Sequence, residues 1–137
     1  MQAAEDPGMS TTMHRGVKWI LRIGVAGTFA GHGLYALMAR PSWIPYLMTV
    51  GFSSEMALKI MPLIGVIDLT VALMALIKPL RIVFLWAACW AFLAATIRPL
   101  SGESILEFVE RASLWAVPLA YLFLAGLPRK LSDLFKT

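Results

Sequence analysis

Four long apolar stretches occupy most of this 137-residue chain, and they constrain its fold more than any other feature. They cover residues 17–38, 57–77, 80–97 and 105–127. A membrane-spanning helix needs about 20 mainly apolar residues, and each stretch is close to that length. Hydrophobic residues make up 59% of the chain and charged residues 15%, against roughly 45–50% and 25% in soluble domains. We therefore predict an integral membrane protein.

The segments between the stretches are too short to form a second domain. Short connections place successive helices antiparallel and side by side, so we predict an all-α fold, a four-helix up-and-down bundle. The segment 40–48 carries two prolines and several aromatic residues suited to the lipid headgroups, which predicts a short interfacial helix between the first two spans. The polar residues 1–15 are predicted to be a disordered tail, and residues 129–137 a cytoplasmic tail.

Charge is distributed towards the ends of the apolar stretches. The net charge of +4 is therefore no sign of nucleic-acid binding, which needs basic residues grouped on one surface. An up-and-down bundle puts eight of the twelve Lys and Arg residues on one side: Arg15, Lys18, Arg22, Lys78, Arg81, Arg129, Lys130 and Lys136. The other four, Arg40, Lys59, Arg98 and Arg111, fall on the opposite side. The positive-inside rule then predicts a multi-pass inner (plasma) membrane protein with both termini in the cytoplasm.

Small residues are dense in the first stretch, where they allow a neighbouring helix to approach closely. Gly27 and Gly31 have the spacing of a dimerising motif, but we expect them to pack within the chain. Cys89 is the only cysteine, which excludes an internal disulfide and a cysteine-built metal site. No metal centre is predicted.

Polar groups inside the apolar stretches indicate where function lies, because an ionised side chain at the bilayer centre costs at least about 2.5 kcal/mol. A helix rises about 1.5 Å per residue, which puts His32 roughly 9 Å below the outer surface. Trp90 and Glu110 fall near the same level, and Asp68 lies deeper. If these side chains face inward, they form one polar layer. The candidate residues for a ligand or proton site are His32, Tyr35, Asp68, Trp90, Glu110 and Arg111.

Two interpretations of this layer are open. A neutral imidazole beside a carboxylate can exchange protons or donate a hydrogen bond to a quinone carbonyl, while tryptophan supplies a flat apolar wall. Alternatively, Asp68 is protonated and bonds to His32, Tyr35 or a backbone carbonyl, which would only hold the helices together. Glu107 and Arg111 are four residues apart and are predicted to form an ion pair at the start of the last helix.

Residues in the first two stretches resemble a known family. The opening pattern of the DoxX family, an arginine followed by spaced glycines, a phenylalanine and a polar-Gly pair, resembles Arg22, Gly24, Gly27, Phe29, His32 and Gly33. The segment 64–68, Ile-Gly-Val-Ile-Asp, is similar to the family's apolar-Gly-apolar-apolar-acid segment. The resemblance covers residues 18–127. The chain departs from the pattern at residues 34–37, which lack the family's usual lysine, and at Asp68, where glutamate is commoner.

The resemblance to DoxX and DoxD-like proteins implies a small membrane subunit of an oxidoreductase assembly, including thiosulfate-to-quinone electron transfer. By position it implicates His32 and Asp68, with Glu110 and Arg111 resembling a Glu-Arg pair that opens the last helix. The leading prediction is a small subunit or quinone-proximal partner of a membrane redox complex, without a catalytic motif of its own. Its ligand would be a quinone, and its partners the lipid bilayer, other redox subunits or a second copy of the chain.

Two other functions stay open at this point. One is a proton-coupled small-molecule transporter that acts as a dimer, with Asp68 as the carboxylate that gains and loses the proton. The other is a purely structural subunit of an assembly, in which His32 has no role.

Overall fold

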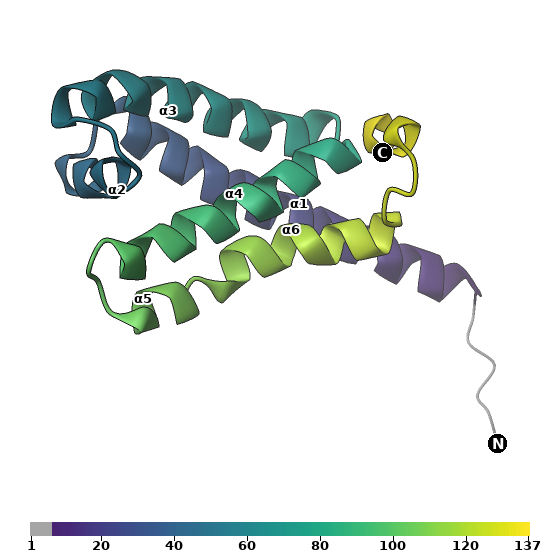
Figure 1. The fold of residues 1–137 in the computed structure, drawn as a ribbon. Coiled ribbons are helices and arrows are strands. Elements are labelled where there is room, and N and C mark those ends of the chain that lie inside the picture. The colour runs from purple at the N-terminus through teal and green to yellow at the C-terminus, as the bar shows by residue number, and fades with distance from the viewer. Residues whose placement is uncertain (1–6) are drawn as a thin grey trace.

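The computed structural model describes residues 7–137, with side chains from Thr11 onward, and every regular element in this range is a helix (Figure 1). The elements are α1 (Pro7–Leu37), η1 (Pro41–Trp43), α2 (Ile44–Thr49), α3 (Ser54–Ile77), α4 (Arg81–Leu100), α5 (Ile105–Val109), α6 (Ala112–Ala125) and η2 (Leu131–Phe135). The all-α prediction is confirmed for these residues.

Helix α1 begins at Pro7 and therefore includes residues 7–15, which the sequence analysis assigns to a disordered tail. Proline is tolerated in the first turn of a helix, where its missing N–H has no partner to lose. No second proline interrupts the chain before Pro41, so the helix continues to Leu37. The first six residues of the predicted tail lie outside the described residues.

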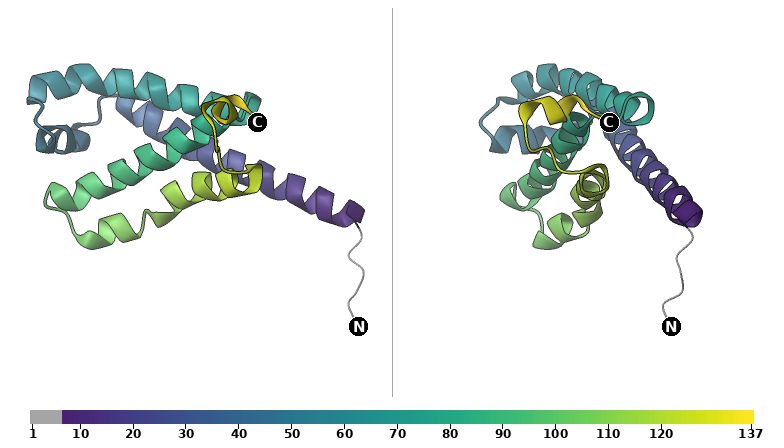
Figure 2. Two further views of the ribbon diagram at one scale, coloured as in Figure 1. Left: turned by 45° about the vertical axis from the view of Figure 1, so that its right-hand side comes forward. Right: turned by 90° about the vertical axis from the view of Figure 1, so that its right-hand side faces the viewer.

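The long helices form two hairpins. Helix α1 packs along α3, with η1 and α2 in the connection between them, and α4 packs along α6. The hairpins meet mainly through α1 and α6, whereas α3 and α4 contact each other little. Figures 1 and 2 show the hairpins diverging towards the end that carries α2 and α5. The start of α1 and the C-terminus both lie at the opposite end, where the hairpins converge.

The core lies where the hairpins converge. Phe84 of α4 and Tyr121 of α6 stack with their ring centroids 3.7 Å apart, and both are buried. Val25 and Phe29 of α1 pack into the same cluster. Alanines complete the buried faces of α3 and α4, and their small side chains let the helix backbones approach closely.

Two glycines set the distance between α1 and α3. A Cβ atom added to Gly65 would lie 2.7 Å from the carbonyl oxygen of Gly33 and 2.8 Å from the backbone nitrogen of Leu37. By contrast, a Cβ added to Gly27 or Gly31 would meet nothing within 4 Å. The prediction that Gly27 and Gly31 pack within the chain is therefore wrong, because the helix contact is made two residues further along, at Gly33.

Three helical stretches of the described chain are long and apolar enough to cross a membrane: Ser54–Ile77, Arg81–Leu100 and Ile105–Ala125. They correspond to the second, third and fourth predicted spans. The predicted first span is not among them, although α1 has 31 residues. Arg22, His32 and the glycines lower its hydropathy below that of the other three. The fourth stretch is divided between α5 and α6, where the α-helix is interrupted at Glu110 and Arg111.

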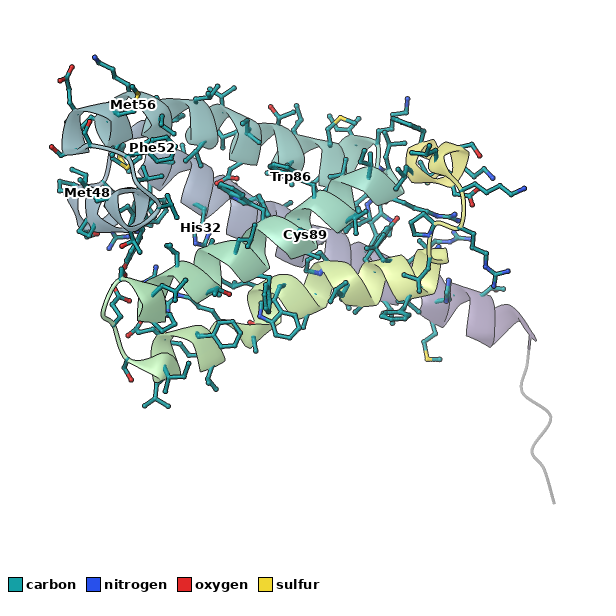
Figure 3. All side chains as sticks on the ribbon, in the orientation of Figure 1. His32, Met48, Phe52, Met56, Trp86 and Cys89 are labelled. Carbon is teal, nitrogen blue, oxygen red and sulfur yellow. The ribbon has the colours of Figure 1, made fainter. Side chains whose placement is uncertain are left out.

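The outer surface of the helices is rich in large apolar side chains (Figure 3). Ile23, Leu63, Phe92 and Phe123, one from each long helix, are 44–68% exposed. A soluble monomer rarely exposes contiguous apolar patches larger than a few hundred Å². Exposed apolar side chains along every long helix are typical of a membrane protein, which presents them to lipid.

Candidate functional site

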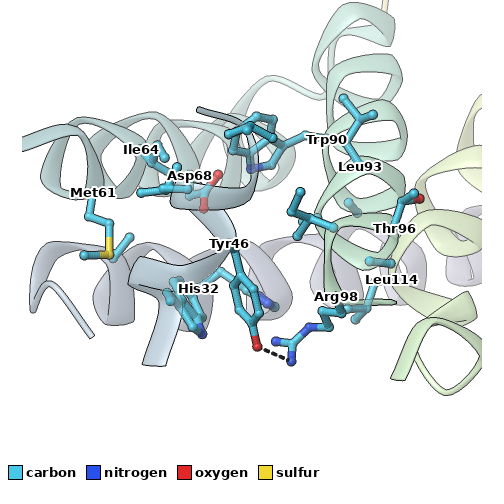
Figure 4. Close-up of a pocket in the computed structure, with 18 of the residues that line it drawn as sticks. His32, Tyr46, Met61, Ile64, Asp68, Trp90, Leu93, Thr96, Arg98 and Leu114 are labelled. Atoms are coloured by element: carbon cyan, nitrogen blue, oxygen red, sulfur yellow. Dashed lines mark hydrogen bonds between the residues drawn. The ribbon is translucent and has the colours of Figure 1, made fainter. Parts of the chain in front are cut away.

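A cavity of about 590 Å³ opens between the hairpins at their diverging end (Figure 4). Ligand pockets in proteins usually measure about 300–1,000 Å³, so this one has room for a drug-sized molecule. Its walls come from α1, α2, α3 and α4, with contributions from the start of α6. Most of the lining is apolar and includes Phe29, Leu47, Met61, Ile64, Leu93, Ala94 and Leu114.

The carboxyl group of Asp68 forms one wall of the cavity. Asp68 lies three residues after Gly65 on the inner face of α3, and only 3% of its surface is exposed. Its Oδ1 atom is buried without a hydrogen-bond partner. A buried acceptor left without a partner costs about 1–3 kcal/mol. Such an atom on a cavity wall is available to a ligand.

Trp90 of α4 lies beside Asp68 and forms a flat wall (Figure 4). Its indole stacks on that of Trp86, with ring centroids 5.7 Å apart and an interplanar angle of 10°. Trp86 itself is 43% exposed and is labelled in Figure 3. The stack fixes the orientation of Trp90 towards the cavity.

His32 lines the same cavity from α1. Its Nδ1 atom lies 2.9 Å from the carbonyl oxygen of Thr28, and its ring stacks on Trp43 at 5.6 Å between centroids. A carbonyl oxygen can only accept, so the proton of the neutral ring is assigned to Nδ1. Nε2 is then an acceptor, which reverses the expectation that neutral His32 donates a hydrogen bond to a quinone carbonyl.

Polar contacts at the mouth of the cavity link α2 to the end of α4. The Tyr46 hydroxyl donates a hydrogen bond to Glu103, and Nη1 of Arg98 lies 3.0 Å from the Tyr46 oxygen and 3.3 Å from Glu103. Burial and the neighbouring Glu103 carboxylate raise the pKa of Tyr46. The hydrogen bond from Tyr46, together with the charge of Arg98, lowers the pKa of Glu103. These three side chains hold α2 over the cavity.

A second set of ion pairs lies beside this cluster. Nη1 of Arg111 is 2.7 Å from Glu107 and 2.5 Å from Glu110. The predicted pair between Glu107 and Arg111 is confirmed. Because Arg111 also lines the cavity, the start of the last helix forms part of its mouth.

The structure brings four of the six candidate residues together, since His32, Asp68, Trp90 and Arg111 all line the cavity. Tyr35 instead lines an adjoining hollow of about 450 Å³, which shares His32 and Arg111 with the cavity. Glu110 lines neither space, and its side chain is 62% exposed in the ion pair with Arg111.

Among the residues of the site that the sequence analysis missed are Trp43, Tyr46 and Arg98. The segment 40–48 indicates headgroup contact, and Arg98 indicates the end of a span, but neither signal predicts a cavity wall. Their place in the site depends on α2 folding against α4, which lies about fifty residues further along the chain.

The charged groups on the cavity wall are one carboxyl group, Asp68, and two guanidinium groups, Arg98 and Arg111. Both guanidinium groups are already paired with glutamates, and the rest of the lining is mainly apolar. Among the described residues, no group of three or more His, Cys, Asp and Glu side chains is placed to hold a metal ion. A ligand of this site is therefore best described as uncharged and largely apolar, with at least one polar atom that reaches Asp68.

Comparison with known proteins gives no match: no protein-family model matches the chain, and neither a curated protein nor a solved structure does. The resemblance to the DoxX family stays a prediction from the residues quoted for it.

Proposed function

We propose that this chain is a four-span membrane protein whose cavity binds the ring of a lipophilic quinone, and that it serves as a small subunit or quinone-proximal partner of a membrane oxidoreductase. One observation carries the proposal. The buried Oδ1 atom of Asp68 has no hydrogen-bond partner, and it lies on the wall of an apolar cavity that also contains His32 and Trp90.

The chemistry of the cavity fits the flat, uncharged ring that a quinone has in both its oxidised and its reduced form. A quinone headgroup is flat, uncharged and mostly apolar, with polar oxygens at opposite ends of the ring. Trp90 offers a flat surface for such a ring, and the polar atoms of Asp68 and His32 lie on the walls around it. The resemblance to DoxX and DoxD-like proteins likewise implies a small subunit of an oxidoreductase assembly that uses quinone. We assign no turnover reaction to the chain, and a partner subunit would supply or accept the electrons.

The membrane arrangement belongs to the same proposal. Helix α1 would be the fourth span, buried partly against α3 and α6, which explains how a less apolar helix is tolerated. Helix α2 would lie at the outer headgroup level, and both termini would be cytoplasmic.

The two alternative functions fit the cavity less well. A proton-coupled small-molecule transporter would use Asp68 as the carboxylate that gains and loses the proton, but the flat apolar wall of Trp90 favours a quinone ring over a general small-molecule substrate. A purely structural subunit gives no reason for an unpartnered carboxyl oxygen, because an apolar residue at position 68 would avoid its cost.

The test is purification from native membranes in mild detergent, followed by lipid extraction and identification of co-purifying chains. We expect quinone in the extract of the wild type and none in those of Asp68→Asn and His32→Ala. Glu55→Gln is the matched control, because Glu55 is on the same helix with its side chain 79% exposed. Extracts that contain no quinone, from a protein without a redox partner, would contradict the proposal.

A further inference from the structure

Both polar groups identified deep in the cavity can accept hydrogen bonds. Asp68 presents the unpartnered Oδ1 atom. His32 uses Nδ1 at the Thr28 carbonyl, which leaves Nε2 of the neutral ring as an acceptor. An ionised carboxylate only accepts, whereas a protonated carboxyl group would also donate one hydrogen bond, so Asp68 is purely an acceptor in its ionised form.

Hydrogen-bond donors are engaged at the mouth of the cavity instead. The Tyr46 hydroxyl donates to Glu103, and the hydroxyl of Thr96 donates to the carbonyl oxygen of Phe92 at 2.8 Å. Arg98 and Arg111 form ion pairs with glutamates. Trp90 also carries a donor at the deep end, but its indole N–H interacts with the carboxyl group of Asp68. These donors are therefore engaged, whereas the unpartnered Oδ1 atom of Asp68 and Nε2 of His32 offer the acceptors that a ligand hydroxyl requires.

The two states of a quinone differ in this respect. The oxidised ring carries carbonyl oxygens, which accept, and the reduced ring carries hydroxyl groups, which donate. We propose that this cavity, if it is a quinone site as argued above, binds the hydroquinone form through a hydroxyl group that donates to Asp68, and so holds the reduced form more tightly than the oxidised form.

The expected preference follows from the value of one hydrogen bond. A hydrogen bond to a charged group contributes enough for a difference of about tenfold or more in affinity, whereas a carbonyl placed at an acceptor gains nothing. Tighter binding of the reduced form makes the bound quinone easier to reduce. A tenfold preference corresponds to a rise of about 30 mV in the midpoint potential of a two-electron couple.

The test uses three ligands of nearly the same shape: a decyl benzoquinone, its hydroquinone and the dimethyl ether of that hydroquinone, which has no hydroxyl donors. Their affinities are measured by anaerobic equilibrium dialysis against the full chain in detergent. We expect the hydroquinone to bind about tenfold more tightly than the other two. Asp68→Asn should reduce the difference to within about twofold, and Glu55→Gln should preserve it.

The outcomes separate this inference from the proposed function. Equal binding of all three ligands, or tighter binding of the quinone, would overturn the hydroxyl preference and leave a quinone site in place. Failure of all three to bind, or binding of the lipophilic cation tetraphenylphosphonium instead, would overturn the proposed function as well. The comparison with the dimethyl ether uses the unchanged chain, so it does not depend on the folding of a variant.

Discussion

At the scale of the residue, Asp68 carries a cost in stability that the proposed ligand would relieve. Its carboxyl group is removed from water by α3 and its neighbours, yet one oxygen lacks a partner. Proteins retain such a group only where something other than stability favours it. His32 is different, because its ring is held by Thr28 and Trp43 and has a stable place even without a ligand.

We expect Asp68→Leu to raise the free energy of unfolding by about 1 kcal/mol and to abolish quinone binding. Leucine removes the unpartnered acceptor, and the cavity can accommodate its slightly larger side chain. The measurement is denaturant unfolding in detergent, with ligand content determined on the same preparations. A marked loss of stability would mean that the carboxyl group is satisfied in the folded protein.

Tyr46→Phe should lower the thermal unfolding midpoint by a few degrees, because it breaks the connection of α2 to Glu103 and Arg98. Tyr35→Phe is the control, since the contacts of Tyr35 with Arg40 and Trp43 are made by its ring. The effect should depend on pH. The pKa of Glu103 is lower in the folded protein than in the unfolded chain. The contribution of its carboxylate to the free energy of unfolding is therefore present above the unfolded pKa and is lost as pH falls through the folded pKa.

The raised pKa of Tyr46 acts at the other end of the pH scale. The contribution of the Tyr46 hydroxyl to the free energy of unfolding is present below the unfolded pKa of about 10, and it is lost as pH rises through the folded pKa. The difference in midpoint between wild type and Tyr46→Phe should therefore be constant from about pH 6 to 9 and shrink towards both extremes. An equal difference at pH 3 would show that the hydroxyl acts independently of Glu103.

At the scale of the element, α1 carries two kinds of glycine. Gly33 is covered by α3, where its backbone touches that of Gly65, whereas Gly27 and Gly31 face open space. Local sequence cannot separate the two kinds, because all lie in the same small-residue stretch. The partner helix makes the distinction.

Gly65→Ala should destabilise the α1–α3 hairpin by about 1–3 kcal/mol, because the added methyl group would meet backbone atoms that cannot move aside. Gly31→Ala should be neutral or stabilise the protein by about 0.5–1 kcal/mol, because alanine lowers the entropy of the unfolded chain and meets nothing. Unfolding of both variants in detergent measures the difference. Similar destabilisation by both would indicate that Gly31 contacts another helix, for example in a second copy.

At the scale of the whole molecule, the two ends of the hairpins are held differently. At the converging end, Arg22 donates to the carbonyl oxygens of Ala75 and Leu76 at the end of α3, and Nη2 of Arg81 lies 2.6 Å from the carbonyl oxygen of Ala125 at the end of α6. Cations at helix C-termini are stabilising. Arg22 thus joins α1 to the end of α3, and Arg81 joins α4 to the end of α6. At the opposite end the two hairpins diverge around the cavity.

The orientation in the membrane can be tested with single cysteines in a Cys89→Ala background. We expect a membrane-impermeant maleimide on intact cells to label Ser104→Cys, which lies between α4 and α5, and to leave Ser132→Cys unlabelled until the cells are opened. The reverse pattern would place the termini outside. The Cys89→Ala background without a new cysteine is the control for unspecific labelling.

Length and hydropathy were sufficient to predict the all-α fold and three helical stretches long and apolar enough to cross a membrane, because both follow from the composition of contiguous segments. The spacing of Glu107 and Arg111 likewise predicted their ion pair, since one helical turn brings them together. The cavity was not predictable in the same way. It arises because α3 and α4 diverge while α2 packs against both of them, so that Asp68, His32 and Tyr46 line one space. Such contacts between distant segments leave no periodic pattern in the chain.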